Sequence, residues 1–261
     1  MPSEAGDDLS IGKGLRDKVV VVTGASSGIG REAALLFERV GARVFATSND
    51  PAGLDSLSKS MADSSRHYFH SANLANTEEC EGIISTALAQ FGEIFVLAHV
   101  AGGLIRKPLF DVTEEDWDYQ QNVNLRSGFF LNRAACKAMV ASNTPGRILN
   151  FTSTSWMMGP LNGSDAYVAA KGGIVSMNRG FARQFGKYGI RINVIAPGQV
   201  NTPMQHVDND PALIAAAAAS CPLGRMGEPD ELARVAVFIA SDQASFVHGA
   251  TINVSGGILL Y

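Results

Sequence analysis

Two residues of the chain, Tyr167 and Lys171, combine side chains and a spacing that suit proton transfer. Residues four apart lie on the same face of a helix, so a phenol and an ammonium group would be neighbours there. A nearby cation favours the phenolate, which would lower the pKa of the tyrosine from about 10 toward the working range of a general acid and base. The pair predicts a catalytic tyrosine if the surrounding elements build a site around it.

A glycine-rich turn near the N-terminus is the second candidate. Residues 24–30 read Gly-Ala-Ser-Ser-Gly-Ile-Gly, between a β-branched run at 18–23 and a helical pattern that begins at Arg31. In this context the glycine backbone can approach a diphosphate closely, and the helix start offers it N–H groups. We therefore predict a dinucleotide site with these contacts: Gly24, Ser26, Ser27, Gly28, Ile29 and Gly30.

Strand-like and helix-like runs alternate along the chain. Strand patterns cover 18–23, 42–47, 67–72, 94–100, 147–152, 190–195 and 250–254, and later helical patterns cover 78–91, 114–141, 165–187 and 231–241. This alternation predicts the α/β fold class, a doubly wound parallel sheet of Rossmann type with helices on both faces. We expect a single domain, 16–261, after a disordered N-terminal tail at 1–15.

Ligands of such sheets lie outside the carboxyl ends of the strands, so the residues after each strand are candidate contacts. Ser48 and Asn49 follow the second strand, where the adenosine ribose normally lies. Because neither residue is acidic, nothing there repels a 2′-phosphate, and NADP is favoured over NAD as the cofactor. Further cofactor candidates at strand ends are Asn73, Leu74, Ala101, Gly102, Pro197 and Gly198.

Apolar residues near the catalytic candidates mark the substrate side. The segment 199–227 has no regular pattern and is typical of a lid or substrate loop. An apolar pocket of Leu104, Thr154, Trp156 and Met204 would suit a moderately bulky, hydrophobic alcohol or ketone. Aromatic and methionine side chains in such a run can equally belong to the core or to a subunit contact.

Composition argues against several classes of protein. The net charge of −4 disfavours nucleic acid or an anionic membrane surface as partner. The three cysteines form no C-x-x-C pair, which favours a reducing compartment and indicates neither a disulfide framework nor a metal site. The sequence has no apolar run of membrane-spanning length, and its acidic start is unlike a signal peptide, so we expect a cytoplasmic protein.

Taken in order, these motifs resemble those of the short-chain dehydrogenase/reductase family. The matching pieces are Thr23–Gly30, Asn124 in Val-Asn-Leu, Ser153, Tyr167-x-x-x-Lys171, Pro197-Gly198 with Thr202, and 222–229. The resemblance implies an NAD(P)-dependent oxidoreductase that interconverts secondary alcohols and ketones. It also implies a homo-oligomer, often a tetramer, and contacts from Val200 and Thr202 to the nicotinamide carboxamide or the diphosphate.

The resemblance implies roles for the four polar residues of the motif set. Tyr167 would exchange a proton with the substrate oxygen, and Ser153 would hydrogen-bond the same oxygen. Lys171 would lower the pKa of Tyr167 and hold the hydroxyls of the nicotinamide ribose. Asn124 would hold a water that links Lys171 to solvent. The cofactor would carry the hydride, while the protein would supply position and the proton.

The chain departs from the family pattern at three places. His99 and Val100 stand where the family has two asparagines, and we expect His99 to be packed or backbone-bonded. Phe95 stands in place of an aspartate, and Asn73 replaces the aspartate beside the adenine. These departures motivate a second interpretation, a dinucleotide-binding sensor or scaffold without turnover.

A serine hydrolase is the third interpretation. Residues 24–28 match G-x-S-x-G with Ser26 as the nucleophile, and Asp242 and His248 follow in the order of a catalytic triad. The nucleophile would, however, lie after the first strand, with no sheet before it, and the glycine run to Gly30 would have no purpose.

Overall fold

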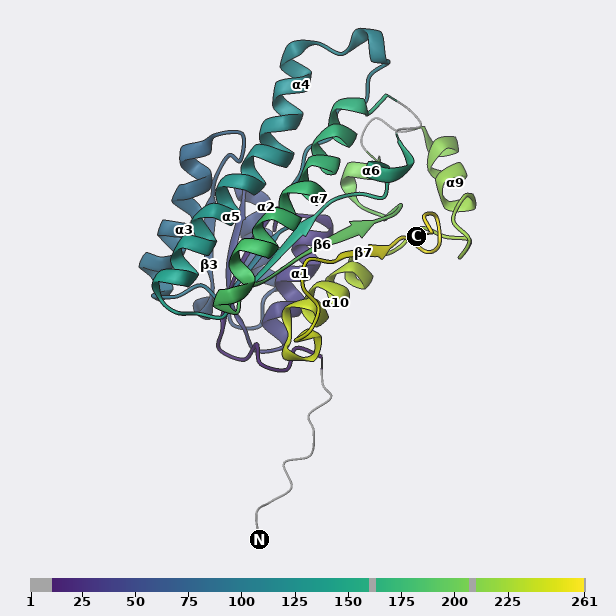
Figure 1. Cartoon of the computed structure of the whole chain (residues 1–261). Coiled ribbons are helices and arrows are strands. Elements are labelled where there is room, and N and C mark those ends of the chain that lie inside the picture. Colours follow the sequence, from purple (N-terminus) through teal and green to yellow (C-terminus); the bar gives the residue numbers. More distant parts are fainter. Residues whose placement is uncertain (1–10, 160–162, 207–209, 261) are drawn as a thin grey trace.

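The structure, a computed structural model, describes residues 11–159, 163–206 and 210–260. Its centre is a sheet of seven parallel strands in the order β3-β2-β1-β4-β5-β6-β7 (Figure 1). The strands are β1 Val19–Thr23, β2 Arg43–Ser48, β3 Tyr68–Ser71, β4 Val96–His99, β5 Arg147–Phe151, β6 Arg191–Pro197 and β7 Thr251–Val254. The predicted fold class is confirmed. The strand order reverses between β1 and β4, the place where doubly wound sheets bind their ligands.

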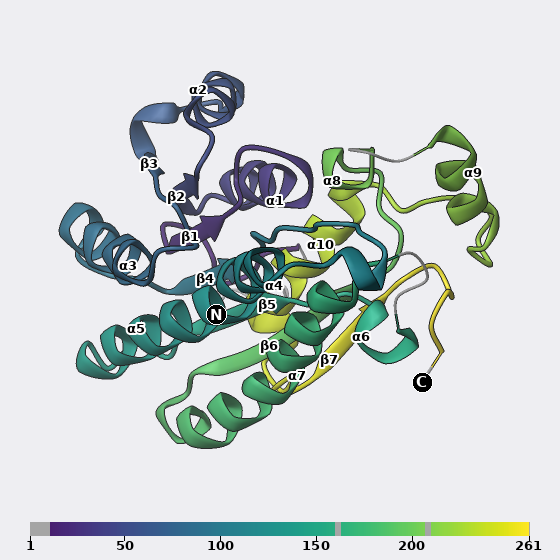
Figure 2. The same cartoon turned by 90° about the horizontal axis from the view of Figure 1, so that it is seen from above.

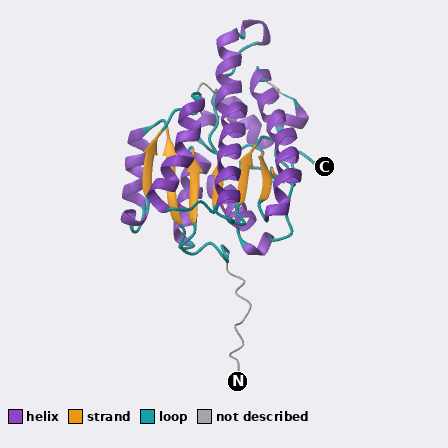
Figure 3. Ribbon diagram, turned by 60° about the vertical axis from the view of Figure 1, so that its left-hand side comes forward, coloured by secondary structure: helices purple, strands orange, loops and turns teal. Residues whose placement is uncertain are grey.

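Helices cover both faces of the sheet (Figure 2). They are α1 Gly28–Arg39, α2 Pro51–Ser60, α3 Thr77–Phe91, α4 Glu114–Gln120, α5 Ser127–Ala141, α6 Ser155–Met158, α7 Asp165–Phe185, α8 Pro203–His206, α9 Pro211–Ala219 and α10 Pro229–Ala240. Helices α1 and α10 pack together on one face, and α3, α5 and α7 cover the other. Figure 3 shows the strands side by side across the molecule, with helices passing in front of them.

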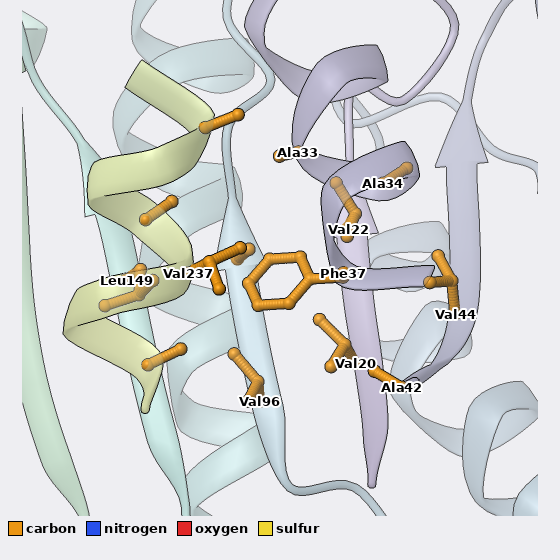
Figure 4. Close-up of a cluster of buried hydrophobic side chains, with 14 of the residues drawn as sticks. Val20, Val22, Ala33, Ala34, Phe37, Ala42, Val44, Val96, Leu149 and Val237 are labelled. Atoms are coloured by element: carbon orange, nitrogen blue, oxygen red, sulfur yellow. The ribbon is translucent and has the colours of Figure 1, made fainter. Parts of the chain in front are cut away.

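The core follows from the alternation of side chains along buried strands. Val20 and Val22 of β1 point into the cluster under α1 and α10, whereas Val21 points into the cluster under α3 and α5. The aromatic ring of Phe37, from α1, lies among Val20, Val22 and Val237 (Figure 4). Because helices cover both faces of the sheet, β1 is apolar at consecutive positions instead of alternating between apolar and polar residues.

The helix predicted at 114–141 is divided into three parts. Thr113 caps α4 with a capping box, as expected, and a π-helical segment, Gln121–Arg126, separates α4 from α5. Asn124 lies in this segment, and its side chain donates 2.9 Å to the carbonyl of Gln120. Such π-helical turns are frequent at functional sites. Helical periodicity alone continues through the segment, which is why the sequence predicts one unbroken helix.

Two predicted segment boundaries differ from the structure. Of the predicted tail, residues 1–10 lie outside the described residues, while Leu15 is fully buried in the core cluster under α1. Within the predicted substrate loop, 199–227, the structure has the short helices α8 and α9, and the alanine run forms α9. Asp210 begins α9 as its N-cap and Pro211 takes the first helical position.

None of the helices in the described part of the chain is both long and apolar enough to cross a membrane.

We predict that Phe37→Ala lowers the free energy of unfolding by about 3 to 5 kcal/mol, because it leaves a cavity in the fully buried cluster. Urea denaturation followed by circular dichroism measures the change. Phe110→Ala is the matched control, since the side chain of Phe110 is 98% exposed, and it should change stability by no more than about 0.5 kcal/mol. Equal losses for the two variants would contradict this account of the core.

Candidate active site

A cavity of about 800 Å³ lies at the carboxyl ends of the strands, the edge that the sequence predicts for ligand binding. Its size is in the range of cofactor and substrate sites. Every predicted site residue except Asn124 and Trp156 lines it, from the glycine turn after β1 to Tyr167 on α7. The cavity therefore joins the candidate dinucleotide turn to the candidate proton donor in one continuous space.

Three polar side chains meet at one end of this cavity. Ser153, just after β5, is hydrogen-bonded to the phenol oxygen of Tyr167. Lys171 lies one helical turn further along α7, with its Nζ 5.4 Å from the centre of the Tyr167 ring. The same Nζ donates 2.9 Å to the carbonyl of Phe151, the last residue of β5. The sequence spacing thus places the phenol and the ammonium on one face of a helix, as predicted.

Burial changes the protonation of both residues. The low polarity around Tyr167 raises its pKa to about 12, against the hydrogen bond from Ser153 and the positive charge of Arg106, which lower it. Burial lowers the pKa of Lys171 to about 7, so its positive charge is half lost at neutral pH. The expectation that Lys171 lowers the tyrosine pKa is therefore wrong, because burial raises it. Lys171 does not offset the effect of burial on the tyrosine pKa, because Lys171 is itself desolvated and its charged form is disfavoured.

Asn124 stands behind the cavity wall. Its amide nitrogen donates 2.8 Å to the carbonyl of Gly103, and its Oδ1 accepts 3.2 Å from the Gly103 N–H. A Cβ atom at Gly102 would lie 2.7 Å from this Oδ1 and 3.2 Å from Lys171 Nζ, so the amide and the ammonium flank one small space. Asn124 is fully buried and bonded to backbone, not solvated, and its side chain anchors the loop after β4.

The glycine turn fits the diphosphate of a dinucleotide. Gly24 has a φ of +68°, and a Cβ there would lie 2.8 Å from the Cα of Ala101. A Cβ at Gly30 would collide with the carbonyl of Gly24, so the first turn of α1 packs directly on the end of β1. The N-cap of α1, Ser27, makes no side-chain cap bond, and the first turn has no acidic residue. The N–H groups of that turn are thus suited to an anion in the cavity.

The predicted adenosine end carries neutral polar groups. Ser48 Oγ lies 2.8 Å from Ser26 Oγ, and both residues line the cavity with Asn49. Asp50, one residue further on, is turned away to cap α2, where its side chain accepts from the N–H of Gly53. Asn73 also lines the cavity, and its Oδ1 accepts 3.0 Å from the N–H of Ala75.

His99 is a packed histidine. Its Nδ1 lies 2.9 Å from Thr23 Oγ1 and its Nε2 lies 3.2 Å from Ser127 Oγ, so it ties β4 to β1 and to α5. Burial, together with the charge of Lys171, lowers its pKa to about 3. The ring is therefore neutral at physiological pH, and a backbone hydrogen bond at Asn124 acts on it together with the two hydroxyl groups.

Trp156 is the predicted pocket residue that the structure places elsewhere. It packs against the cluster of Ile174, Val175 and Val194, and it is not among the cavity-lining residues, whereas Met158 is. Residues two apart on a helix point to nearly opposite sides, so α6 can direct only one of the two into the cavity. The other predicted substrate residues, Leu104, Thr154 and Met204, line it.

Two cavity residues have no signal in the sequence motifs. Ser155 Oγ donates 2.9 Å to Ser153 Oγ, so it fixes the orientation of that hydroxyl. Arg106 lines the cavity and reaches α8, where it donates to the carbonyl of Met204 and to Gln205 Oε1. The positive charge of Arg106 in the loop after β4 is a signal that the sequence does contain. A sequence does not tell, however, which way a loop side chain points.

The hydrolase triad is not assembled. Ser26 follows the carboxyl end of β1, whereas Asp242 pairs with Arg147, the first residue of β5, at the opposite edge of the parallel sheet. His248 accepts from the N–H of Ile192 near the start of β6. The hydrolase interpretation is therefore wrong, because parallel strands place these residues at opposite ends of the sheet.

Known proteins resemble the chain along nearly its whole length. The chain matches the family model described as enoyl-(acyl carrier protein) reductase over residues 24–259. It is 34% identical over 258 residues to the (2S)-[(R)-hydroxy(phenyl)methyl]succinyl-CoA dehydrogenase subunit BbsD of Thauera aromatica, which covers 95% of this chain and 99% of that protein. It is 33% identical over 246 residues to the 3-oxoacyl-[acyl-carrier-protein] reductase FabG of Vibrio cholerae, covering 94% of this chain and 99% of that one.

The crystal structure of gox2181 superimposes with a TM-score of 0.88 at 29% sequence identity, covering 94% of this chain and 96% of that one. The chain thus matches relatives along nearly their full length, and its fold matches that of a solved structure. The chain belongs to the short-chain dehydrogenase/reductase family of oxidoreductases.

Proposed function

We propose that the chain transfers a hydride between a nicotinamide cofactor and a secondary alcohol or ketone, with Tyr167 as general acid and base. The observation that carries the proposal is the Ser153–Tyr167 hydrogen bond on the wall of a cavity that continues to the glycine turn. Binding of a dinucleotide alone needs no phenol at that place. The sensor or scaffold alternative keeps the turn but leaves this pair of hydroxyl groups without a purpose.

In the reducing direction, Tyr167 donates its proton to the carbonyl oxygen of the substrate, and in the oxidising direction it accepts the hydroxyl proton. Ser153 holds the same oxygen, and Ser155 orients Ser153 through its hydrogen bond. The hydride would be supplied or accepted by a nicotinamide cofactor when one is bound. With a pKa raised to about 12, the phenol of Tyr167 is protonated at neutral pH and is therefore ready to donate in the reducing direction.

Lys171 and Asn124 support this proton transfer. Lys171 holds the hydroxyls of the nicotinamide ribose, and its lowered pKa of about 7 lets it pass protons near neutral pH. Asn124 faces the same small space as Lys171 Nζ, which suits a water that links the lysine to solvent.

The glycine turn would hold the diphosphate, and Val200 and Thr202 would hold the carboxamide end of the cofactor. Ser48 and Asn49 would face the adenosine ribose. Their neutral side chains support NADP over NAD, since a carboxylate there would repel a 2′-phosphate.

The substrate end of the cavity combines apolar and polar walls. Leu104, Met158, Met204 and Leu213 line it and support a substrate with a moderately bulky apolar part. The relative FabG is named for its action on 3-oxoacyl groups, so 3-oxoacyl thioesters belong in the first substrate panel. We also propose that the protein works as a homo-oligomer.

We predict that Tyr167→Phe lowers turnover of any accepted alcohol about 10²- to 10⁴-fold, because the phenyl ring cannot exchange a proton. Dinucleotide affinity, followed by nicotinamide fluorescence, should be retained. Tyr188→Phe, at an exposed tyrosine outside the cavity, is the matched control and should leave turnover unchanged. Turnover of Tyr167→Phe within tenfold of the parent enzyme would exclude the proton-transfer role.

We predict that kcat/KM for alcohol oxidation rises with pH between about pH 6 and pH 10, because the phenolate fraction of Tyr167 grows as pH approaches its raised pKa of about 12. Reduction needs the protonated phenol and should not rise. Ser153→Ala removes a hydrogen bond that lowers the tyrosine pKa, so the oxidation profile should move to higher pH. A flat profile, with a deuterium isotope effect that shows hydride transfer to be rate-limiting, would count against the assignment.

We predict that Ser48→Asp weakens NADP binding at least tenfold and strengthens NAD binding, because its carboxylate repels the 2′-phosphate and accepts from ribose hydroxyls. Ser48→Asn is the control, because it also removes the serine hydroxyl that bonds Ser26 but adds no charge. It should keep the preference for NADP. Fluorescence titration measures the affinity of each variant for NADP and for NAD. A preference for NADP that is unchanged in Ser48→Asp would show that the ribose lies elsewhere.

A further inference from the structure

A second cavity lies at the amino ends of the strands, at the edge of the sheet opposite the candidate active site. Its volume is about 330 Å³, and it shares no described lining residue with the first cavity. Arg147 and Arg191, the first residues of β5 and β6, both line it, together with Ser245 and His248. Among the described residues that line it, none is acidic, so its wall is positively charged.

The register of the sheet places the two arginines side by side. Arg147 pairs with Arg191 between β5 and β6. Residues paired in this way lie about 4.8 Å apart and point to the same face of the sheet. Each arginine is only 8% exposed. Two like charges are thus held next to each other and away from water, which costs free energy unless negative charge lies close to them.

The negative charge next to this pair is incomplete. In the part of the chain that the structure describes, one carboxylate forms an ion pair with the arginines: Asp242 accepts 3.0 Å from Arg147. The other face of the Arg147 guanidinium lies 4.7 Å from the centre of the Phe95 ring, which carries no formal charge. The hydrogen bonds of Arg191 run to three backbone carbonyls, those of Ala240, Ser241 and Val247. One carboxylate therefore faces two cations.

Both arginines stay charged at neutral pH. Burial, and after it the charge of Arg147, lowers the pKa of Arg191 to about 10, while the charge of Asp242 raises it. A pKa of about 10 leaves the guanidinium protonated at pH 7. The pair therefore keeps an excess positive charge under physiological conditions.

Each guanidinium also has N–H groups without a partner. An arginine has five N–H donors, and the structure gives each of these two arginines three hydrogen bonds. The Nε atom of each is buried and has no hydrogen-bond partner among the described residues. Buried donors without partners cost free energy. Excess charge and unused donors on one cavity wall together favour a bound anion.

We propose that this cavity binds a phosphate group, either free or carried by a small molecule. Guanidinium groups bind phosphate oxygens through charge-assisted, paired hydrogen bonds. A tetrahedral anion suits the site better than a planar carboxylate, because its oxygens point in different directions and can meet two arginines at once. Ser245, exposed on the same wall, adds a hydroxyl group. The inference concerns a different site from the proposed function and does not rest on it.

Calorimetric titration of the full chain with inorganic phosphate tests the proposal. Phosphate should bind, and acetate at the same ionic strength should bind about tenfold more weakly, because it cannot meet both arginines. Glycerol 3-phosphate is titrated in parallel: tighter binding than inorganic phosphate indicates a phosphate ester as the ligand, and weaker binding indicates free phosphate. Phosphate at about ten times its Kd should also raise the melting temperature by a few degrees.

Ser245→Glu is the variant that locates the anion, because it adds a carboxylate to the cavity wall and keeps both arginines. It should weaken phosphate binding by about tenfold or more through charge repulsion. Ser85→Glu, at an exposed serine of α3 outside the cavity, is the matched control and should bind phosphate like the parent. Arg147→Lys keeps the charge but lacks the planar fork, so it should also bind phosphate more weakly. Circular dichroism checks that each variant is folded.

Phosphate binding that is equal in the parent and in Ser245→Glu would place the anion elsewhere, such as at the glycine turn, and would overturn the inference. An equal loss in Ser85→Glu would overturn it too, since only the net charge of the molecule would then matter. If neither phosphate compound binds the parent, or phosphate binds no better than acetate, the arginines serve only to link β5 and β6 to the end of α10. None of these readouts involves turnover, so the proposed function stands or fails separately.

Discussion

Parallel pairing of β1 with β4 places the glycine turn against the loop after β4, and the remainder of the site depends on that contact. The register sets Thr23 opposite His99, so β1 and β4 end side by side and the loops that follow them begin next to each other. Gly24 then packs on Ala101 at a distance that leaves no room for a side chain. The same loop continues to Gly102 and Gly103, where Asn124 takes its hydrogen bonds. One pairing therefore positions both the predicted dinucleotide turn and the wall behind Lys171.

The protonation states of the site follow from its burial rather than from neighbouring pairs of opposite charge. Desolvation raises the pKa of Tyr167 and lowers those of Lys171 and His99, so each group is driven toward its neutral form. Buried groups of this kind respond strongly to any charge that a ligand brings close to them, because surroundings of low polarity screen charge weakly.

The departures from the family pattern are accommodated within the structure. His99 has polar partners on both ring nitrogens, so the position keeps the polar contacts that a buried side chain needs. Asn73 keeps its place on the cavity wall while its Oδ1 closes a local turn with Ala75. Phe95 is buried between the guanidinium of Arg147 and the ammonium of Lys18, which stack on its ring. None of these features removes a residue from the Ser153–Tyr167 end of the cavity.

The fold class and most of the site could be predicted from the sequence because they depend on local patterns. Buried parallel strands require apolar runs, a close backbone approach requires glycines, and ligands gather where such strands end. The spacing of Tyr167 and Lys171 on one helix follows from helical geometry alone. Each of these features is visible in a short stretch of residues, and the order of the stretches along the chain then indicates the fold.

Other features were decided by tertiary structure. The side chain of Asn124, in the π-helical segment, donates to a carbonyl twenty-one residues away in sequence, and helical periodicity does not report this contact. Whether Trp156 or Met158 faces the cavity depends on how α6 is rotated against α7. The pKa of Tyr167 depends on the depth of burial, and the direction of Arg106 depends on where α8 lies. All are set by contacts between distant segments, because desolvation and side-chain orientation are properties of the packed molecule and not of any stretch of its sequence.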